Sequence, residues 1–123
     1  MIDRSDLESL ADYRNTENPV VSLYLNITPP RSYEAELNSM IHSTLREIEA
    51  EGRFDEKQVK RLKDLLDKIA DYVEKESKRF SGTRLVAIFA DADGFWQEHY
   101  LPVGLSSSMV VDADPYTRPL TML

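Results

Sequence analysis

The chain has 123 residues, 41% apolar and 30% charged, which is the composition of an ordinary globular domain with one hydrophobic core. It has no cysteine, which excludes disulfides, thiolate catalysis and cysteine-ligated zinc. Its net charge of −7 argues against binding nucleic acid through bulk charge, but a local basic patch stays compatible with that number.

The first part of the chain shows a helix signal followed by a strand signal. Residues 5–8, SDLE, have the spacing of a capping box with Ser5 as N-cap, which predicts a helix that runs to about Arg14. Residues 20–27, VVSLYLNI, alternate apolar and polar side chains, which is the period of a strand. The Pro29-Pro30 pair should end that strand, because proline cannot donate to a ladder.

A helical hairpin is predicted next. Apolar residues recur at helical spacing from Tyr33 to about Glu51, where Gly52 is a suitable breaker. Asp55 is the expected N-cap of a longer helix that reaches about Phe80. The short link makes the two helices antiparallel, so a long hairpin should project beyond the sheet, with tip side chains that contribute little to folding. The second helix carries a narrow apolar seam of Val59, Leu62, Leu66, Ile69 and Val73.

Three strand signals complete the chain. Residues 85–90, LVAIFA, are apolar without alternation, which predicts a central strand with Ile88 and Phe89 buried on opposite faces. Residues 95–101 and 108–113 are two further strands, and the short links predict that the last three strands are antiparallel neighbours. The expected fold class is α/β: about four mostly antiparallel strands, with the hairpin on one face and the first helix on the other.

The segment Asp91-Ala92-Asp93-Gly94 is either a metal loop or a turn between strands. A calcium loop of the EF-hand type ends on a glutamate, but counted from Asp91 that position is Pro102. Asp-Gly between strong β-formers favours a hairpin turn in which Gly94 supplies a positive φ. On this interpretation Asp91→Asn should change stability little.

The other polar residues do not form a recognisable catalytic pattern. His42 and His99 are the only histidines, and no grouping of nucleophile, base and orienting residue follows from the sequence. Asp112 and Asp114, like the aspartates of the turn, lie at a strand end where aspartate favours turns. We therefore expect no enzyme activity, no metal and no cofactor; an enzyme with its site at these carboxylates is the least favoured alternative.

The turn of the hairpin is the most suggestive functional segment. From residue 53 to residue 63 five basic residues stand against two acidic ones, a local excess of three positive charges on an acidic chain. This pattern is compatible with a solvated helix start, and also with a contact surface for RNA or for a partner protein. The candidate contact residues are Arg53, Phe54, Lys57, Lys60 and Arg61.

The order of these parts resembles the N-terminal domain of the archaeal and eukaryotic class-one peptide chain release factors, and more closely that of their bacterial relatives. The resemblance is carried by VSLYLNITPP at 21–30, TRLVAIFADADGFWQEHYLPV at 83–103 and DADPYTRPLTML at 112–123. It covers nearly all of residues 1–123 as one domain. The apolar ending, residues 120–123, favours a domain excised from a longer multidomain protein.

The resemblance implies a non-catalytic domain that helps a larger protein dock on the ribosome, in termination or rescue, with the hairpin tip on ribosomal RNA. In the family this turn carries an Asn-Ile-Lys-Ser motif, whereas residues 49–58 of this chain read EAEGRFDEKQ. The resemblance therefore assigns no residue of this chain a role in reading stop codons. The family's Gly-Gly-Gln motif lies in the following domain and is absent from this chain. The alternative function is a protein-protein or oligomerisation module that uses the hairpin seam.

Nothing in the sequence predicts a membrane or secreted protein. No apolar run approaches the roughly 20 residues that span a bilayer. The start, MIDRSDLESL, lacks the basic and apolar segments of a secretory signal. We therefore expect a cytoplasmic location, with no membrane and no DNA among the partners.

Overall fold

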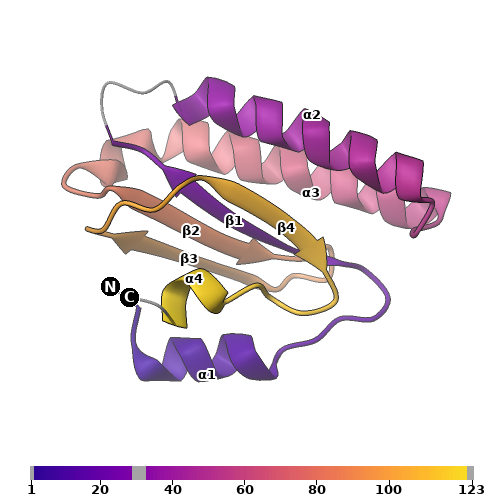
Figure 1. The fold of residues 1–123 in the computed structure, drawn as a ribbon, viewed down its shortest axis with the longest axis horizontal. Coiled ribbons are helices and arrows are strands. Elements are labelled where there is room, and N and C mark those ends of the chain that lie inside the picture. The colour runs from indigo at the N-terminus through magenta and orange to yellow at the C-terminus, as the bar shows by residue number, and fades with distance from the viewer. Residues whose placement is uncertain (1, 29–32, 122–123) are drawn as a thin grey trace.

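The computed structural model describes residues 2–28 and 33–121, which form an antiparallel four-stranded sheet with helices on both faces (Figure 1). This confirms the predicted fold class. None of the described helices is long and apolar enough to cross a membrane. The elements in chain order are α1 (Arg4–Asp12), β1 (Val20–Asn26), α2 (Tyr33–Glu51), α3 (Glu56–Lys75), the 3-10 helix η1 (Ser77–Phe80), β2 (Leu85–Ala90), β3 (Trp96–Leu101), β4 (Ser108–Asp112) and α4 (Arg118–Thr121).

The strand order is β3-β2-β1-β4, so β2 is an inner strand as predicted, and all its residues are buried. The prediction that the last three strands are neighbours is wrong for β4. This strand pairs with β1, with Val21 opposite Val111, and lies at the edge opposite β3. The β3–β4 link, residues 102–107, is long enough to pass the ends of the inner strands. β1 can then pair on both sides, and the helix layers bury both of its faces.

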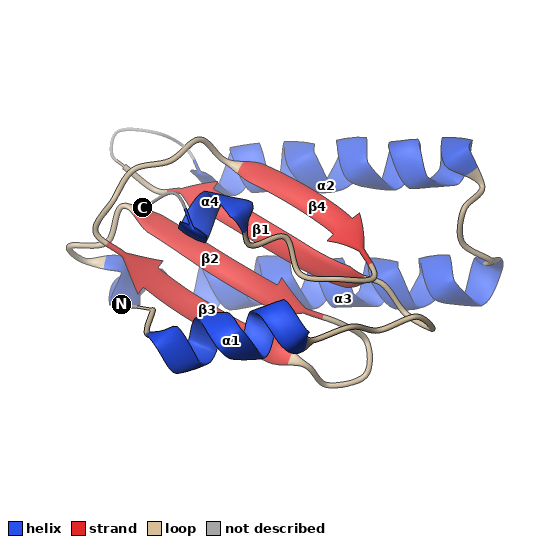
Figure 2. Ribbon diagram, turned by 60° about the horizontal axis from the view of Figure 1, so that its bottom comes forward, coloured by secondary structure: helices blue, strands red, loops and turns tan. Residues whose placement is uncertain are grey.

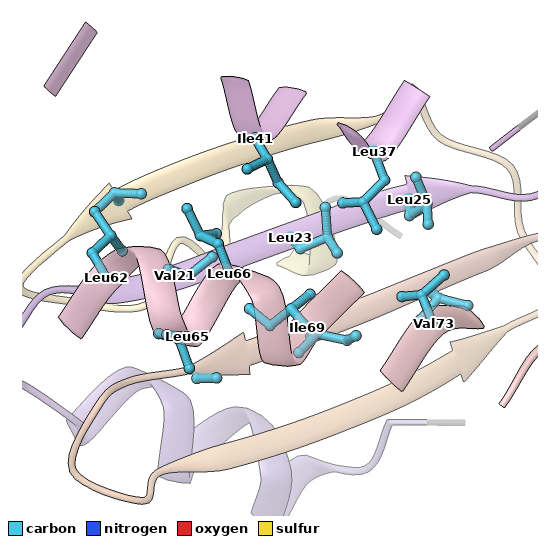
Figure 3. Packing of buried hydrophobic residues seen from close by; sticks show 14 of the residues in the cluster. Val21, Leu23, Leu25, Leu37, Ile41, Leu62, Leu65, Leu66, Ile69 and Val73 are labelled. Carbon is cyan, nitrogen blue, oxygen red and sulfur yellow. The ribbon is translucent and has the colours of Figure 1, made fainter. Parts of the chain in front are cut away.

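The hairpin covers one face of the sheet. Figure 3 shows side chains of α2 and α3 meeting those of β1, with Leu66 of α3 close to Val21 and Leu23. Ile88 belongs to this layer. The predicted seam is buried here within the chain, except for Val59, which is only half-buried.

α1 and α4 lie on the opposite face (Figure 2). Phe89 packs there beside Tyr24, Leu10 and Leu120, so Ile88 and Phe89 point to opposite faces as predicted. The polar side-chain groups of Ser22 and Tyr24 in β1 form hydrogen bonds in the same layer. The Tyr24 hydroxyl donates to the Tyr116 carbonyl at 2.5 Å, and the Tyr116 N–H donates to the Ser22 hydroxyl at 2.8 Å.

The helix ends differ from the sequence prediction in two places. The capping box of α1 is formed by Asp3 and Asp6, not by Ser5 and Glu8, because the Asp3 carboxylate accepts the Asp6 N–H at 2.9 Å and starts the helix earlier. α3 ends at Lys75, and a 3-10 turn then leads to Phe80. Of the predicted breaks, the Pro29-Pro30 pair lies outside the described residues, as do residues 122 and 123 of the apolar ending.

Gly94 has a φ of +96°, as the turn interpretation requires. A Cβ built there meets no atom within 4 Å, so a larger residue would meet backbone strain rather than a clash. We therefore expect Gly94→Val to lower the free energy of unfolding by more than about 1 kcal/mol. Gly94→Asn should cost less, because asparagine tolerates positive φ better than a β-branched residue. Urea denaturation measures both, and equal losses would contradict the strain argument.

Candidate functional site

The tip of the hairpin lies at one end of the molecule, where α2 and α3 extend beyond the ends of the strands (Figure 2). Gly52 ends α2 with a φ of +63°. Asp55 caps α3 as predicted: its carboxylate accepts the Gln58 N–H at 2.8 Å, and the Gln58 side chain accepts the Asp55 N–H at 2.9 Å. The Gln58 amide also donates to the Glu17 carbonyl at 2.5 Å, which ties the tip to the α1–β1 loop.

Arg53 does not extend freely into solvent. Its Nη2 donates to the Val111 carbonyl of β4 at 2.9 Å, and its Nε lies 3.7 Å from a carboxylate oxygen of Glu51. Its guanidinium carbon is 4.8 Å from the centre of the Phe54 ring, and Phe54 packs against the core layer under the hairpin. Phe54 is half-buried and Arg53 is exposed, and both contact other parts of the fold.

The other three candidate residues face different surroundings. Lys57 and Lys60 are exposed. Arg61 is exposed too, but its Nη1 donates to the Asn18 side-chain oxygen at 3.3 Å. Arg61 also lines a hollow of about 300 Å³ together with Asp91 and Gly94 of the β2–β3 loop. Arg53 and Arg61 thus contact other parts of the fold, whereas Lys57 and Lys60 make no hydrogen bond or ion pair with the residues that the structure describes.

A groove at the tip was not foreseen from the sequence. It has a volume of about 420 Å³ and lies between the end of α2 and the start of α3. Lys63 pairs with Glu49 beside it, at 3.2 Å from Nζ to the carboxylate oxygen. Its apolar part is formed by Ile48, Phe54 and Val59, and its charged rim by Glu49, Glu56, Lys60 and Lys63.

The β2–β3 loop is organised by one buried carboxylate. Asp91 is 3% exposed and accepts the N–H groups of Asp93 at 2.8 Å and Phe95 at 3.0 Å. It also accepts the Tyr13 hydroxyl and the Asn15 side-chain amide, the latter at 3.1 Å. Burial and the contact with Asp91 raise the pKa of Tyr13 to about 12. The loop is a turn, as predicted, but Asp91 holds it to the α1–β1 loop.

Asp93 extends this network toward solvent. Its carboxylate accepts the side-chain amides of Asn15 at 2.7 Å and Asn18 at 3.0 Å. The hydrogen bonds from Asn18 and Asn15 hold the pKa of Asp93 below its usual value. The sequence contained no usable signal for this network, because its donors lie 75 to 78 residues from their acceptors.

The remaining candidate residues show no chemical grouping. His42 is exposed, whereas His99 is buried, contacts Gln97 at 3.0 Å, and has its pKa lowered by burial. Asp114 pairs with Arg14 at 3.0 Å on the surface. Within residues 2–28 and 33–121, no group of three or more histidine and carboxylate side chains could hold a metal ion.

Neither a protein-family model nor the sequence of a curated protein matches this chain.

Proposed function

We propose that the chain is a non-catalytic, release-factor-like domain that helps a larger protein dock on the ribosome in the cytoplasm, through cations at the tip of the α2–α3 hairpin. The observation that carries the proposal is the position of Lys57 and Lys60. Both are exposed, and they lie in the first two turns of α3, directly after the turn of the hairpin. An anionic partner such as ribosomal RNA responds to local potential, so a basic tip on a chain of charge −7 is a suitable contact.

The test compares Lys57→Glu/Lys60→Glu with the wild type in co-sedimentation with ribosomes at several salt concentrations. Arg53 and Arg61 stay unchanged, because both contact other parts of the fold. If the two lysines neutralise RNA phosphates, the variant should bind at least about ten-fold more weakly. The slope of log K against log salt should also fall by roughly 1.5.

The matched control is Lys75→Glu/Lys78→Glu, which changes the charge equally near the other end of α3. Lys75 and Lys78 are exposed, as Lys57 and Lys60 are. Circular dichroism and melting should therefore show an intact fold for the test variant and for the control variant. The control should sediment with ribosomes like the wild type. Equal binding of all three proteins would contradict the ribosomal proposal, and equal weakening of both variants would show only a dependence on net charge.

A second candidate function is protein binding at the tip groove. The hairpin seam itself is not available for this purpose, since Leu62 is 2% and Leu66 0% exposed. Val59, by contrast, is half-buried and lines the groove with Ile48 and Phe54. Loss of a dimer or a protein complex on Val59→Asp, with ribosome binding unchanged in the lysine variant, would favour this candidate.

A further inference from the structure

The outer edge of β3 presents a row of backbone groups. Asp91 donates its N–H to the Phe95 carbonyl at 3.1 Å, across a pair that continues the β2–β3 register. Because hydrogen-bonded pairs alternate in an antiparallel ladder, Gln97 and His99 use their backbone toward β2. The N–H and C=O groups of Trp96, Glu98 and Tyr100 therefore point away from the sheet.

The two edges of the sheet differ. On the β4 edge, the Val111 carbonyl accepts from the Arg53 side chain at 2.9 Å, and the Ala113 carbonyl accepts the Asn15 N–H at 2.9 Å. On the β3 edge, the outward backbone groups have no hydrogen-bond partner among the residues that the structure describes. An edge of this kind can pair with an added strand.

Aromatic side chains lie along this edge on the hairpin face. Tyr72 of α3 packs edge-to-face on Trp96, with ring centres 5.2 Å apart, and its hydroxyl hydrogen-bonds that of Tyr100. A hollow of about 420 Å³ opens beside Trp96, lined also by Lys68, Asp71, Tyr72 and Lys75. Trp96, Glu98 and Tyr100 are each half-buried. An added strand would therefore place alternate side chains against these aromatic rings and into the hollow.

Both signs of charge occur at this edge: Lys68, whose Nζ lies 5.3 Å from the centre of the Trp96 ring, and Lys75 line the hollow, whereas Glu98 lies on the strand itself and distinguishes the possible occupants. In the antiparallel register that pairs all three outward residues with those of a second copy, Glu98 would face its own equivalent, and like charges directly opposite are unfavourable. Each copy also carries a net charge of −7. A basic segment instead places a cation opposite Glu98 and meets an acidic protein.

We propose that the outer edge of β3 is a docking site for an extended, basic segment of another protein, which adds to the sheet beside Trp96, Glu98 and Tyr100. The backbone groups supply the affinity, the aromatic rings select apolar side chains, and Glu98 selects lysine or arginine between them. This surface is separate from the hairpin tip, so the two proposals can fail independently.

The probe is a displayed library of heptapeptides with threonine at positions 1, 3, 5 and 7 and randomised residues at positions 2, 4 and 6. Selection against the wild type should enrich lysine or arginine at the middle randomised position, with apolar residues on either side. Selection against Glu98→Lys should enrich aspartate or glutamate there. The best basic peptide should bind Glu98→Lys at least about ten-fold more weakly, because like charges then face each other. Glu98→Gln, which keeps a hydrogen-bond acceptor for the Trp96 indole, should weaken binding without inverting the preference.

Amide hydrogen exchange locates the bound peptide. At saturation the amides of Trp96, Glu98 and Tyr100 should exchange at least about ten-fold more slowly, because each gains a hydrogen bond or protection from water. Those of Met109 and Val111, which face outward from β4, should not change. Enrichment without a basic residue, unchanged exchange at β3, or no enrichment at all would overturn the proposal. A peptide-free dimer that protects the same amides would also overturn it in favour of a second copy.

Discussion

Phe89→Ala should lower the free energy of unfolding by about 3–5 kcal/mol. Phe89 is fully buried in the layer formed by α1 and α4, and its ring meets that of Tyr24 edge-on, with centres 5.7 Å apart at 85°. Removing the ring gives up its transfer free energy and leaves a cavity between β2 and that layer. Because a domain of this size has a total stability of about 5–15 kcal/mol, the variant should be close to unfolding at 25 °C.

Two further variants test whether this loss comes from the removed apolar volume and whether the other face of the sheet is buried too. Phe89→Leu keeps most of the apolar volume and should cost less than half as much. Ile88→Ala removes a side chain from the hairpin face, where a loss of about 2–5 kcal/mol is expected. Urea denaturation gives all three values. A loss below about 1 kcal/mol for Phe89→Ala would mean that its face of the sheet is open to water.

Asp91→Asn should destabilise the domain by at least about 2 kcal/mol, the opposite of what a simple turn predicts. The carboxylate is buried and accepts four hydrogen bonds. An asparagine can still accept the two backbone N–H groups of the loop. Its own NH₂ group would then face the Tyr13 hydroxyl and the Asn15 amide, so these half-buried donors lose their acceptor. Asp91→Ala, which removes every acceptor, should cost more.

The matched control for this change is Asp114→Asn. Asp114 pairs with Arg14 at 3.0 Å, but both side chains are more than half exposed. Such surface pairs contribute about 0–1 kcal/mol, and the loss should be smaller in high salt. Equal losses for Asp91→Asn and Asp114→Asn in urea denaturation would show that the network around Asp91 does not stabilise the fold.

Arg53 and Asp91 show where prediction from the sequence stops. Each lies in a segment whose local form was predicted correctly, a helical turn and a strand turn. The hydrogen bonds of these two side chains were not predictable, because their partners are distant in the chain. Arg53 contacts Val111, 58 residues away, and Asp91 contacts Tyr13, 78 residues away. The sequence made Arg53 a candidate RNA contact but did not show that its guanidinium also donates to the Val111 carbonyl at the edge of β4.

The sequence by itself determined the four strands, the helices α1, α2 and α3, the two-sided burial of β2 and the hairpin that α2 and α3 form, but not the short helix α4. These features depend on the period of apolar residues and on short-range caps and glycines, which act over a few residues. Only the tertiary structure decided the strand order, which edge stays open and which charges are engaged. Those outcomes depend on backbone and side-chain groups that are distant in the chain and meet only when the layers pack. The spacing of apolar and polar residues within one element does not indicate such contacts.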